Sequence, residues 1–410
     1  MSNAGAKKTA ATAAPASSAL RFGRMSGTLS AGLCGLPNVG KSSLFNLLTE
    51  SSVPAENFPF CTIDPSTARC AVPDTRYDAL CRIWNPPSTY PAFLSVTDIA
   101  GLIRGASEGA GLGNAFLSHI QAVDALLHVV RAFEDDSVIH VDDEIDPLRD
   151  LDTIQHELCA KDLAYVDTAE AAALKDVRKT PDMKLPLRFY DVMKKARELL
   201  AADKPVREGE WTGPEVETIR EKLPQLITTK PVVYLVNLSA ADFVRKRNKH
   251  LAGISTWVAA HGGGAVIPMS VAWEEALWAT RNDAVAREAF LADAGGAKSA
   301  LPRAIVTSYR DLELRHYFTC GEKEVRCWTV PAGCAAPDAA GAIHSDFTKL
   351  FIAAEVVSWA DFAEHQLPVT PSVKGFAAVK AAGRYRTEGR SYVVCDGDII
   401  RASTRKRAHV

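Results

Sequence analysis

One motif constrains this chain more than any other feature: residues 35–42 read GLPNVGKS, a G-x-x-x-x-G-K-S pattern. It follows an apolar run at 29–34 and precedes a helix-compatible segment at 43–49. Glycines let successive backbone N–H groups converge on one anion, and the start of the following helix adds partial positive charge. A glycine-rich turn can match this pattern by chance, but the flanking strand and helix favour a phosphate-binding loop.

The loop predicts separate roles for its side chains. Lys41 is expected to reach the β- and γ-phosphates of a bound nucleotide, and Ser42 to place its hydroxyl on Mg²⁺. Asn38 is a candidate K⁺ ligand, because K⁺ beside the phosphates can supply positive charge; it can equally be a turn-favouring residue. The loop residues expected to bind nucleotide are Asn38, Val39, Gly40, Lys41, Ser42 and Ser43.

A second group of residues is expected to complete the magnesium site. Asp98 ends the apolar run 93–97 and begins a D-x-x-G pattern, in which the aspartate organises Mg²⁺ and the N–H of Gly101 faces the γ-phosphate. Thr62 lies between the loop and Asp98, where its hydroxyl can reach the metal. Residues 101–113 contain five glycines, which predicts a mobile switch because glycine loses much backbone entropy when ordered.

The pattern expected to select the base departs from that of guanine-specific proteins. These carry N-K-x-D after a strand, and the aspartate accepts two guanine donors. Here the run 232–236 is followed by Asn237, Leu238, Ser239 and Ala240, and alanine accepts no hydrogen bond. Asn237, Leu238 and Ser270 are expected to surround the base. We therefore expect the site to discriminate only weakly in favour of guanine, so that ATP can bind.

The residue directly after D-x-x-G also differs from the one usually found there. Many proteins of this kind place a glutamine there to orient the attacking water, but this chain has Leu102. Slow hydrolysis is therefore expected, unless another group orients the water.

Strand-like runs separated by helix-compatible segments predict an α/β fold with a mostly parallel sheet. Apolar residues at helical spacing in a charged stretch predict an inserted antiparallel helical arm, which is either solvated or bound to a partner. A smaller α+β unit follows, with strands expected at 324–330, 351–357 and 391–394 and a hairpin turn at 396–397. The expected division is a tail at 1–27, a nucleotide-binding domain at 28–145 and 231–316, the arm at 146–230, the C-terminal domain at 317–403, and a tail at 404–410.

Composition limits the partners and the cellular location that can be expected. The chain has 47 basic and 49 acidic residues, so bulk charge predicts no indiscriminate nucleic-acid binding. No apolar run approaches the length of about 18 residues that spans a bilayer. Residues 1–27 are rich in Ala and Ser and contain no acid, a composition that fits either a mitochondrial transit peptide or a disordered basic tail. We favour the tail, and expect a cytoplasmic monomer.

Four stretches together resemble the YchF-type Obg-like ATPases of the translation-factor-related GTPase class. They are the loop itself, 57–65 (NFPFCTIDP), 98–102 (DIAGL) and 105–114 (GASEGAGLGN). The similarity extends over about residues 29–403. It implies a nucleotide-binding domain interrupted by a coiled-coil arm and followed by a β-grasp TGS domain.

The resemblance also implies Mg²⁺-dependent ATP hydrolysis, ribosome binding, and a regulatory part in translation or stress responses. Through the match at 137–141, it makes His140 the family's proposed catalytic histidine. The family usually has Asn-x-x-Glu where this chain has Asn237 to Ala240, so the implied preference for ATP loses one of its supports here.

Two other functions remain open at this stage. One is a scaffold that binds ribosomes or RNA and holds its nucleotide as a structural ligand; the basic residues Arg384, Arg386 and Arg390 favour it, although such clusters are commonly solvated. The other is a conventional GTPase, which Ala240 disfavours.

Overall fold

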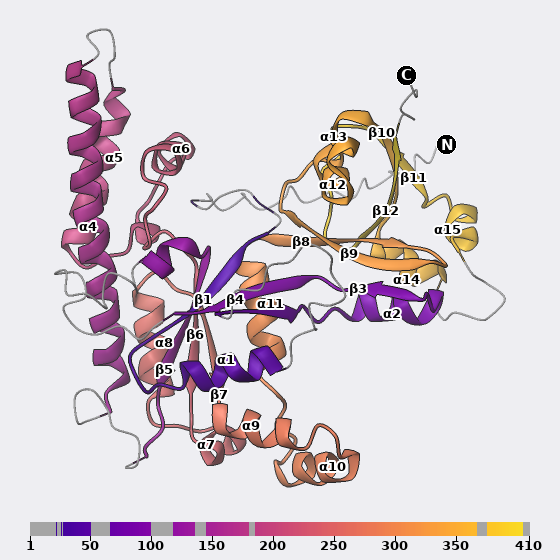
Figure 1. The fold of residues 1–410 in the computed structure, drawn as a ribbon, viewed down its shortest axis with the longest axis horizontal. Coiled ribbons are helices and arrows are strands. Elements are labelled where there is room, and N and C mark those ends of the chain that lie inside the picture. Colours follow the sequence, from indigo (N-terminus) through magenta and orange to yellow (C-terminus); the bar gives the residue numbers. More distant parts are fainter. Residues whose placement is uncertain are drawn as a thin grey trace, which may run out of the picture.

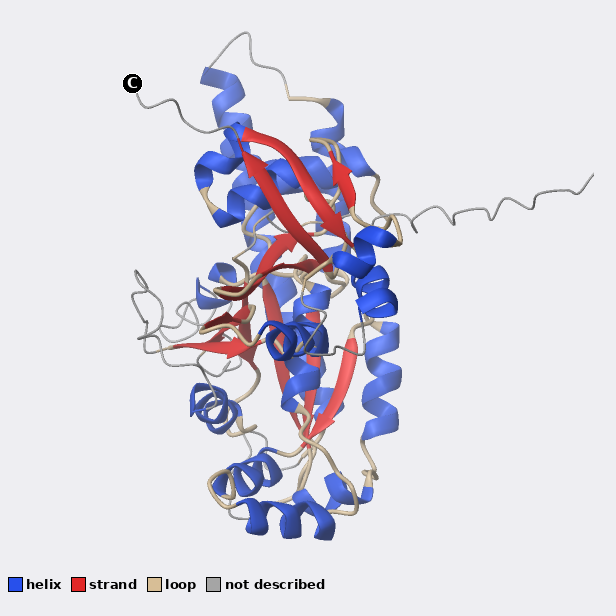
Figure 2. Cartoon of the chain, turned by 90° about the vertical axis from the view of Figure 1, so that its right-hand side faces the viewer, coloured by secondary structure: helices blue, strands red, loops and turns tan. Residues whose placement is uncertain are grey.

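The structure is a computed structural model, and it describes residues 22, 26, 28–50, 66–99, 118–135, 145–179, 185–366 and 375–404. Two six-stranded sheets organise these residues, and Figure 2 shows the C-terminal sheet above the first. No helix in the described ranges is long and apolar enough to cross a membrane.

The first sheet is mostly parallel, as predicted. Its strand order is β2-β4-β1-β5-β6-β7, and only β2 runs antiparallel to its neighbour. Burial of every residue of β5 and β6 reflects coverage of both sheet faces. The strands are β1 (Ser30–Cys34), β2 (Thr67–Ala71), β4 (Phe93–Asp98), β5 (Ala125–Arg131), β6 (Val232–Asn237) and β7 (Ala265–Met269).

Helices flank this sheet, with α8 and α11 on either side of the strands in Figure 1. Ser239, Ser270 and Asp283 each cap a helix, because a side-chain oxygen accepts a hydrogen bond from a backbone N–H of the first turn. The helices are α1 (Lys41–Glu50), α2 (Thr75–Trp84), α7 (Ala240–Arg245), α8 (Leu251–Ala260), α9 (Val271–Ala279), α10 (Ala284–Asp293) and α11 (Leu301–Asp311).

The expected helical arm is present as α4 (Pro147–Lys179) and α5 (Leu187–Ala201), which stand side by side at the left of Figure 1. Arg197 of α5 pairs with Asp167 and Glu170 of α4, and Gln155 contacts the carbonyl of Asp203, so the helices run antiparallel. A separate apolar cluster fills the arm and includes Trp211, beside the short helix η3 (Val206–Glu208) and α6 (Gly213–Lys222).

The C-terminal sheet has the order β11-β10-β12-β8-β9-β3, in which β3 (Ser88–Tyr90) comes from earlier in the chain. The C-terminal part of this sheet begins with β8 at Leu314, slightly before the expected boundary at 317. Its elements are β8 (Leu314–Cys320), β9 (Glu324–Pro331), α12 (Ala336–Ile343), α13 (Ser345–Leu350), β10 (Phe351–Val357), α14 (Trp359–Gln366), α15 (Ala377–Ala381), β11 (Arg386–Glu388) and β12 (Asp398–Thr404).

Two expectations for this sheet were wrong. Residues 391–394 form no strand; Val393 makes one isolated bridge to Ala335, and the final strand is β12. The turn at Asp396-Gly397 does not join a hairpin, because β12 pairs antiparallel with β10 and parallel with β8. Gly397 is needed for a different reason: it has φ 89°, and a Cβ there would lie 2.5 Å from Nη1 of Arg76.

One strand links the two sheets in a way that the sequence did not suggest. The strand β3 (Ser88–Tyr90) belongs by sequence to the nucleotide-binding region, yet it pairs in parallel with β9 of the C-terminal sheet. Helix α2, directly before it, packs on β8 and β9.

Candidate nucleotide-binding site

The phosphate-binding loop joins β1 to α1, as the motif predicts. Gly35 and Gly40 have φ of 146° and 101°, backbone values that residues with a side chain rarely adopt. A Cβ on Gly35 would lie 2.5 Å from the carbonyl oxygen of Val129, and one on Gly40 would lie 2.6 Å from Nδ2 of Asn237. Asn38 occupies the left-handed region with φ 60°, where asparagine is tolerated. The glycines therefore permit both the turn and its close packing.

Lys41 is held inside this loop. Its Nζ donates to the carbonyl oxygen of Leu36 at 2.6 Å, and the residue is 7% exposed. Burial lowers the pKa of the Lys41 ammonium, while nearby Cys34 and Asp98 oppose that shift. A phosphate oxygen in the loop would give the buried cation the charged partner that the Leu36 carbonyl cannot supply.

Asp98 lies next to Ser42 at the end of β4. Its Oδ2 accepts a long hydrogen bond from Oγ of Ser42 at 3.5 Å, while its Oδ1 is buried and has no hydrogen-bond partner among the described residues. Burial raises the pKa of the Asp98 carboxyl, although Lys41 and Ser42 act in the opposite direction. A hydroxyl and an unpaired carboxylate oxygen beside a phosphate loop are the donors that Mg²⁺ prefers, so these residues fit the metal.

Asn237 connects three segments of the site. Its Nδ2 donates to the carbonyl oxygen of Val39 at 2.9 Å, and its Oδ1 accepts from the backbone N–H of Val271 at 3.0 Å. The side chain is 4% exposed, so losing either bond would leave a buried polar group. Ser270, directly before Val271, is the buried N-cap of α9. Asn237 therefore fixes the loop against the segment that follows β7.

A cavity of about 530 Å³ opens at this edge of the sheet. Most of the predicted nucleotide-binding residues line it, together with Ala240, whereas Val39 and Ser270 are buried and do not line it. Sequence reasoning missed Phe133, Glu134, Asp135, Val271, Ala272 and Glu275. The first three follow β5, and the carboxyl end of a parallel strand is a signal that could have identified them. The lining residues are Asn38, Gly40, Lys41, Ser42, Ser43, Phe133, Glu134, Asp135, Asn237, Leu238, Ser239, Ala240, Val271, Ala272 and Glu275.

Several predicted residues cannot be placed in this geometry. Thr62, Gly101, Leu102 and His140 lie outside the described residues. His128, on β5, is in the core, with its ring 5.6 Å from that of Tyr234. Burial lowers the pKa of His128 to about 3, which keeps the imidazole neutral.

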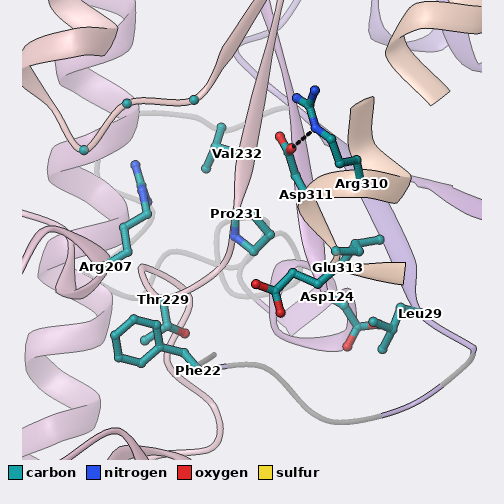
Figure 3. A pocket seen from close by; sticks show the side chains of 14 residues that line it. Phe22, Leu29, Asp124, Arg207, Thr229, Pro231, Val232, Arg310, Asp311 and Glu313 are labelled. Carbon is teal, nitrogen blue, oxygen red and sulfur yellow. Dashed lines mark hydrogen bonds and ion pairs between the residues drawn. The ribbon is translucent and has the colours of Figure 1, made fainter. Parts of the chain in front are cut away.

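A second cavity, of about 450 Å³, lies at the opposite edge of the first sheet (Figure 3). Leu29, Asp124 and Pro231 line it, and each precedes a parallel strand. Arg310 and Asp311 form an ion pair there at 3.2 Å, drawn as a dashed line. None of the predicted site residues lines this cavity.

Family comparisons agree with this geometry. The family described as "50S ribosome-binding GTPase" matches residues 30–166. The C-terminal family of YchF GTPases, described as a protein of unknown function, matches residues 314–404.

Similar proteins match nearly the whole chain. Obg-like ATPase 1 of Oryza sativa subsp. japonica is 47% identical over 388 residues, covering 95% of both chains. Obg-like ATPase 1 of Homo sapiens is 47% identical, covering 92% of this chain and 93% of the human one. The solved YchF GTPase of Schizosaccharomyces pombe superposes with a TM-score of 0.80 at 43% identity, covering 94% of this chain and 100% of that one.

These matches, with the phosphate loop and the two sheets, confirm the predicted fold and the nucleotide-hydrolase class. The chain belongs to the YchF family of Obg-like ATPases.

Proposed function

We propose that this protein is a Mg²⁺-dependent ATPase with slow turnover, whose nucleotide state governs its binding to ribosomes. The observation that carries the proposal is the pair of Lys41, which lines the cavity, and Asp98, which accepts from the cavity residue Ser42. Among the described residues, Nζ of Lys41 bonds only to its own loop, and Oδ1 of Asp98 has no partner. MgATP supplies a phosphate for the first and a metal for the second.

Each side chain then has a defined task. Lys41 neutralises the β- and γ-phosphates, while Ser42 and Asp98 hold Mg²⁺, which offsets the negative charge that develops on the phosphoryl oxygens. Thr62 is proposed as a further metal ligand, Gly101 as a γ-phosphate contact and His140 as a catalytic group. Turnover is slow because Leu102 cannot orient the attacking water.

The cavity also bears on the choice of base. Phe133 and Leu238 offer apolar surface for a purine ring, and Ala240 places a methyl group where guanine-specific proteins have a carboxylate. A guanine bound here would leave its N1–H and N2–H₂ donors without that acceptor, which removes its advantage over adenine. The names of the relatives, Obg-like ATPase 1, support ATP as the substrate.

Ribosome binding rests on the description of the matched family, a 50S ribosome-binding GTPase. We propose that the arm at 146–230 and the TGS domain at 317–403 contact the ribosome from a cytoplasmic monomer, and that Asn38 binds K⁺ beside the phosphates.

Side-by-side titration of ATP, ADP, GTP and GDP, with Mg²⁺ and in K⁺ or Na⁺ buffer, tests the proposal. We expect ATP to bind at least about 10-fold more tightly than GTP, and A240D to reverse much of that difference by restoring the acceptor. Hydrolysis of ATP should disappear in K41A. A large GDP advantage in the unmodified chain would make it a conventional GTPase. Equal inactivity of K41A and the unmodified chain, with unchanged ribosome co-sedimentation, would make it a scaffold.

A further inference from the structure

Strands β8 and β12 of the C-terminal sheet separate after a short ladder. They pair in parallel only at Asp398↔Tyr317 and Ile399↔Phe318, although β8 continues to Cys320 and β12 to Thr404. A cavity of about 440 Å³ opens where they part. Its lining residues are Trp84, Thr319, Cys320, Ile343, Phe347, Glu355, Val357, Phe376, Lys380, Tyr385, Ile399, Ile400, Arg401 and Ala402.

The facing edges of the two strands offer backbone hydrogen-bonding groups to this cavity. The far edge of β8 is paired with β9 as far as Cys320, and the far edge of β12 is paired with β10 as far as Thr404. The edges between them have no ladder partner beyond Ile399↔Phe318 in the described part of the sheet. A strand edge alternates donors and acceptors, which a planar heterocycle can match along one side.

A buried donor also lacks an adequate acceptor here. Nε1 of Trp84 is buried without a hydrogen-bond partner among the described residues. The Cys320 thiol is the group near it, and burial raises the pKa of that thiol to about 12, so it stays neutral and accepts only weakly. An indole N–H without a strong acceptor favours a ligand that brings one.

Aromatic rings and two cations complete the cavity. The rings of Phe376 and Tyr385 lie 5.6 Å apart, and Nζ of Lys380 lies 4.4 Å from the centre of the Tyr385 ring. The side chain of Arg401 is 82% exposed and is 3.9 Å from Oε2 of Glu355, which also accepts from the Tyr385 hydroxyl at 2.9 Å. The site thus combines flat apolar surface with exposed positive charge and one carboxylate.

We propose that this cavity binds a nucleoside phosphate, separately from the phosphate loop. The base occupies the gap between β8 and β12, stacks on Phe376 or Tyr385, and accepts the indole N–H of Trp84 through a ring nitrogen or carbonyl oxygen. Lys380 and Arg401 bind the phosphate, and Glu355 accepts a ribose hydroxyl or an exocyclic amine. An aliphatic side chain would fill the volume but leave both the Trp84 N–H and the strand edges unpaired.

The same chemistry has two sources, a free nucleotide and an unstacked base of single-stranded RNA. The experiment uses the full-length chain carrying K41A, so that the phosphate loop contributes little, and calorimetric titration with AMP, an oligoadenylate hexamer, adenosine and inorganic phosphate. AMP binding at least about 10-fold tighter than the hexamer identifies the free nucleotide; the reverse identifies RNA.

The variants K380A and R401A should each weaken the binding of the preferred ligand by about 5- to 10-fold, because each removes one phosphate contact. W84F keeps an aromatic ring but removes the N–H, and should cost about 3- to 10-fold. R384A is the matched control: this exposed arginine is paired with Asp361 outside the cavity and should change nothing.

Three results would overturn the proposal. They are no binding of AMP or hexamer at millimolar concentration, equal competition by inorganic phosphate, and equal losses in R384A and R401A. Because the test is made in K41A, its failure leaves the proposed ATPase activity untouched, and loss of that activity does not affect this site.

Discussion

The nucleotide cavity and the junction between α2 and the C-terminal sheet both bury charged groups, but they treat them differently. At the cavity, Oδ1 of Asp98, next to the lining residue Ser42, has no partner among the described residues, and Lys41 bonds to a neutral carbonyl. At the junction, the Asp74 carboxylate accepts from the backbone and guanidinium of Arg76 at 2.7–3.2 Å and contacts Nδ1 of His316 at 3.0 Å.

The junction extends from there across the two sheets. Nη1 of Arg76 donates to Asp396 at 2.8 Å, and the other oxygen of Asp396 accepts the backbone N–H of His316 at 2.9 Å. Among the residues the structure describes, the polar atoms buried there without a partner are neutral groups or a ring nitrogen: Nε2 of His316, the hydroxyl of Tyr77 and Nε1 of Trp84. Paired charges at the junction fix the sheets together, whereas the unpaired charges of the cavity favour a charged ligand.

The largest expected effect is on the cavity. D98N removes the metal-binding charge, so affinity for MgATP should fall by about 100-fold or more. The free energy of unfolding should not fall, because within the described residues the carboxylate makes one long hydrogen bond, to Ser42, and its burial is unfavourable. Calorimetric titration and urea denaturation measure the two quantities. Unchanged MgATP affinity would remove Asp98 from the metal site.

The opposite outcome is expected at the junction. R76A leaves Asp74, whose side chain is 8% exposed, without its main ion pair, and should lower the free energy of unfolding by about 2–4 kcal/mol. MgATP affinity should stay within about 2-fold. The matched control is R82A on the same helix, since Arg82 is exposed and, in the described part of the chain, its one hydrogen bond is to the carbonyl of Asp78 at 3.3 Å. Equal losses in both variants would show that the junction adds nothing beyond helix stability.

The sequence could predict the features that depend on residues close together in the chain. The phosphate loop and strands β1, β4, β5 and β6 were predictable, because their signals are local: glycine spacing and short apolar runs. Asp98 was predictable because parallel strands present their carboxyl ends at one edge.

Other features depend on long-range contacts. Three such features join residues far apart in the chain: the pairing of β3 with β9, the ion pair between Arg76 and Asp396, and the position of Glu275 in the cavity lining. No local sequence pattern indicates any of them. The stretch 391–394 was predicted as a strand from its local sequence. In the structure it pairs with Ala335 through a single bridge rather than a ladder, and a local pattern does not show whether a pairing partner is available.

The smallest expected effect concerns the pH dependence of the junction. Burial alone would raise the pKa of Asp74, but the hydrogen bonds from His316 and Arg76 outweigh it and hold the pKa of that carboxyl well below its usual range. A carboxyl with a lowered folded-state pKa stabilises the fold above its unfolded pKa of about 4 and loses that contribution as the pH falls. Lowering the pH from 5 to 3 should therefore cost about 1–2 kcal/mol through Asp74.

Urea denaturation at each pH separates this contribution from that of other carboxylates. D74N should be less stable than the unmodified chain at pH 7, and its free energy of unfolding should fall less steeply between pH 5 and pH 3, because the asparagine cannot be protonated there. D78N removes an exposed carboxylate one turn along α2 and should keep the original slope. If D74N and D78N show the same slope, the Asp74 carboxylate is not selectively stabilised by its partners. The contrast between paired charges at the junction and unpaired charges at the cavity then no longer holds.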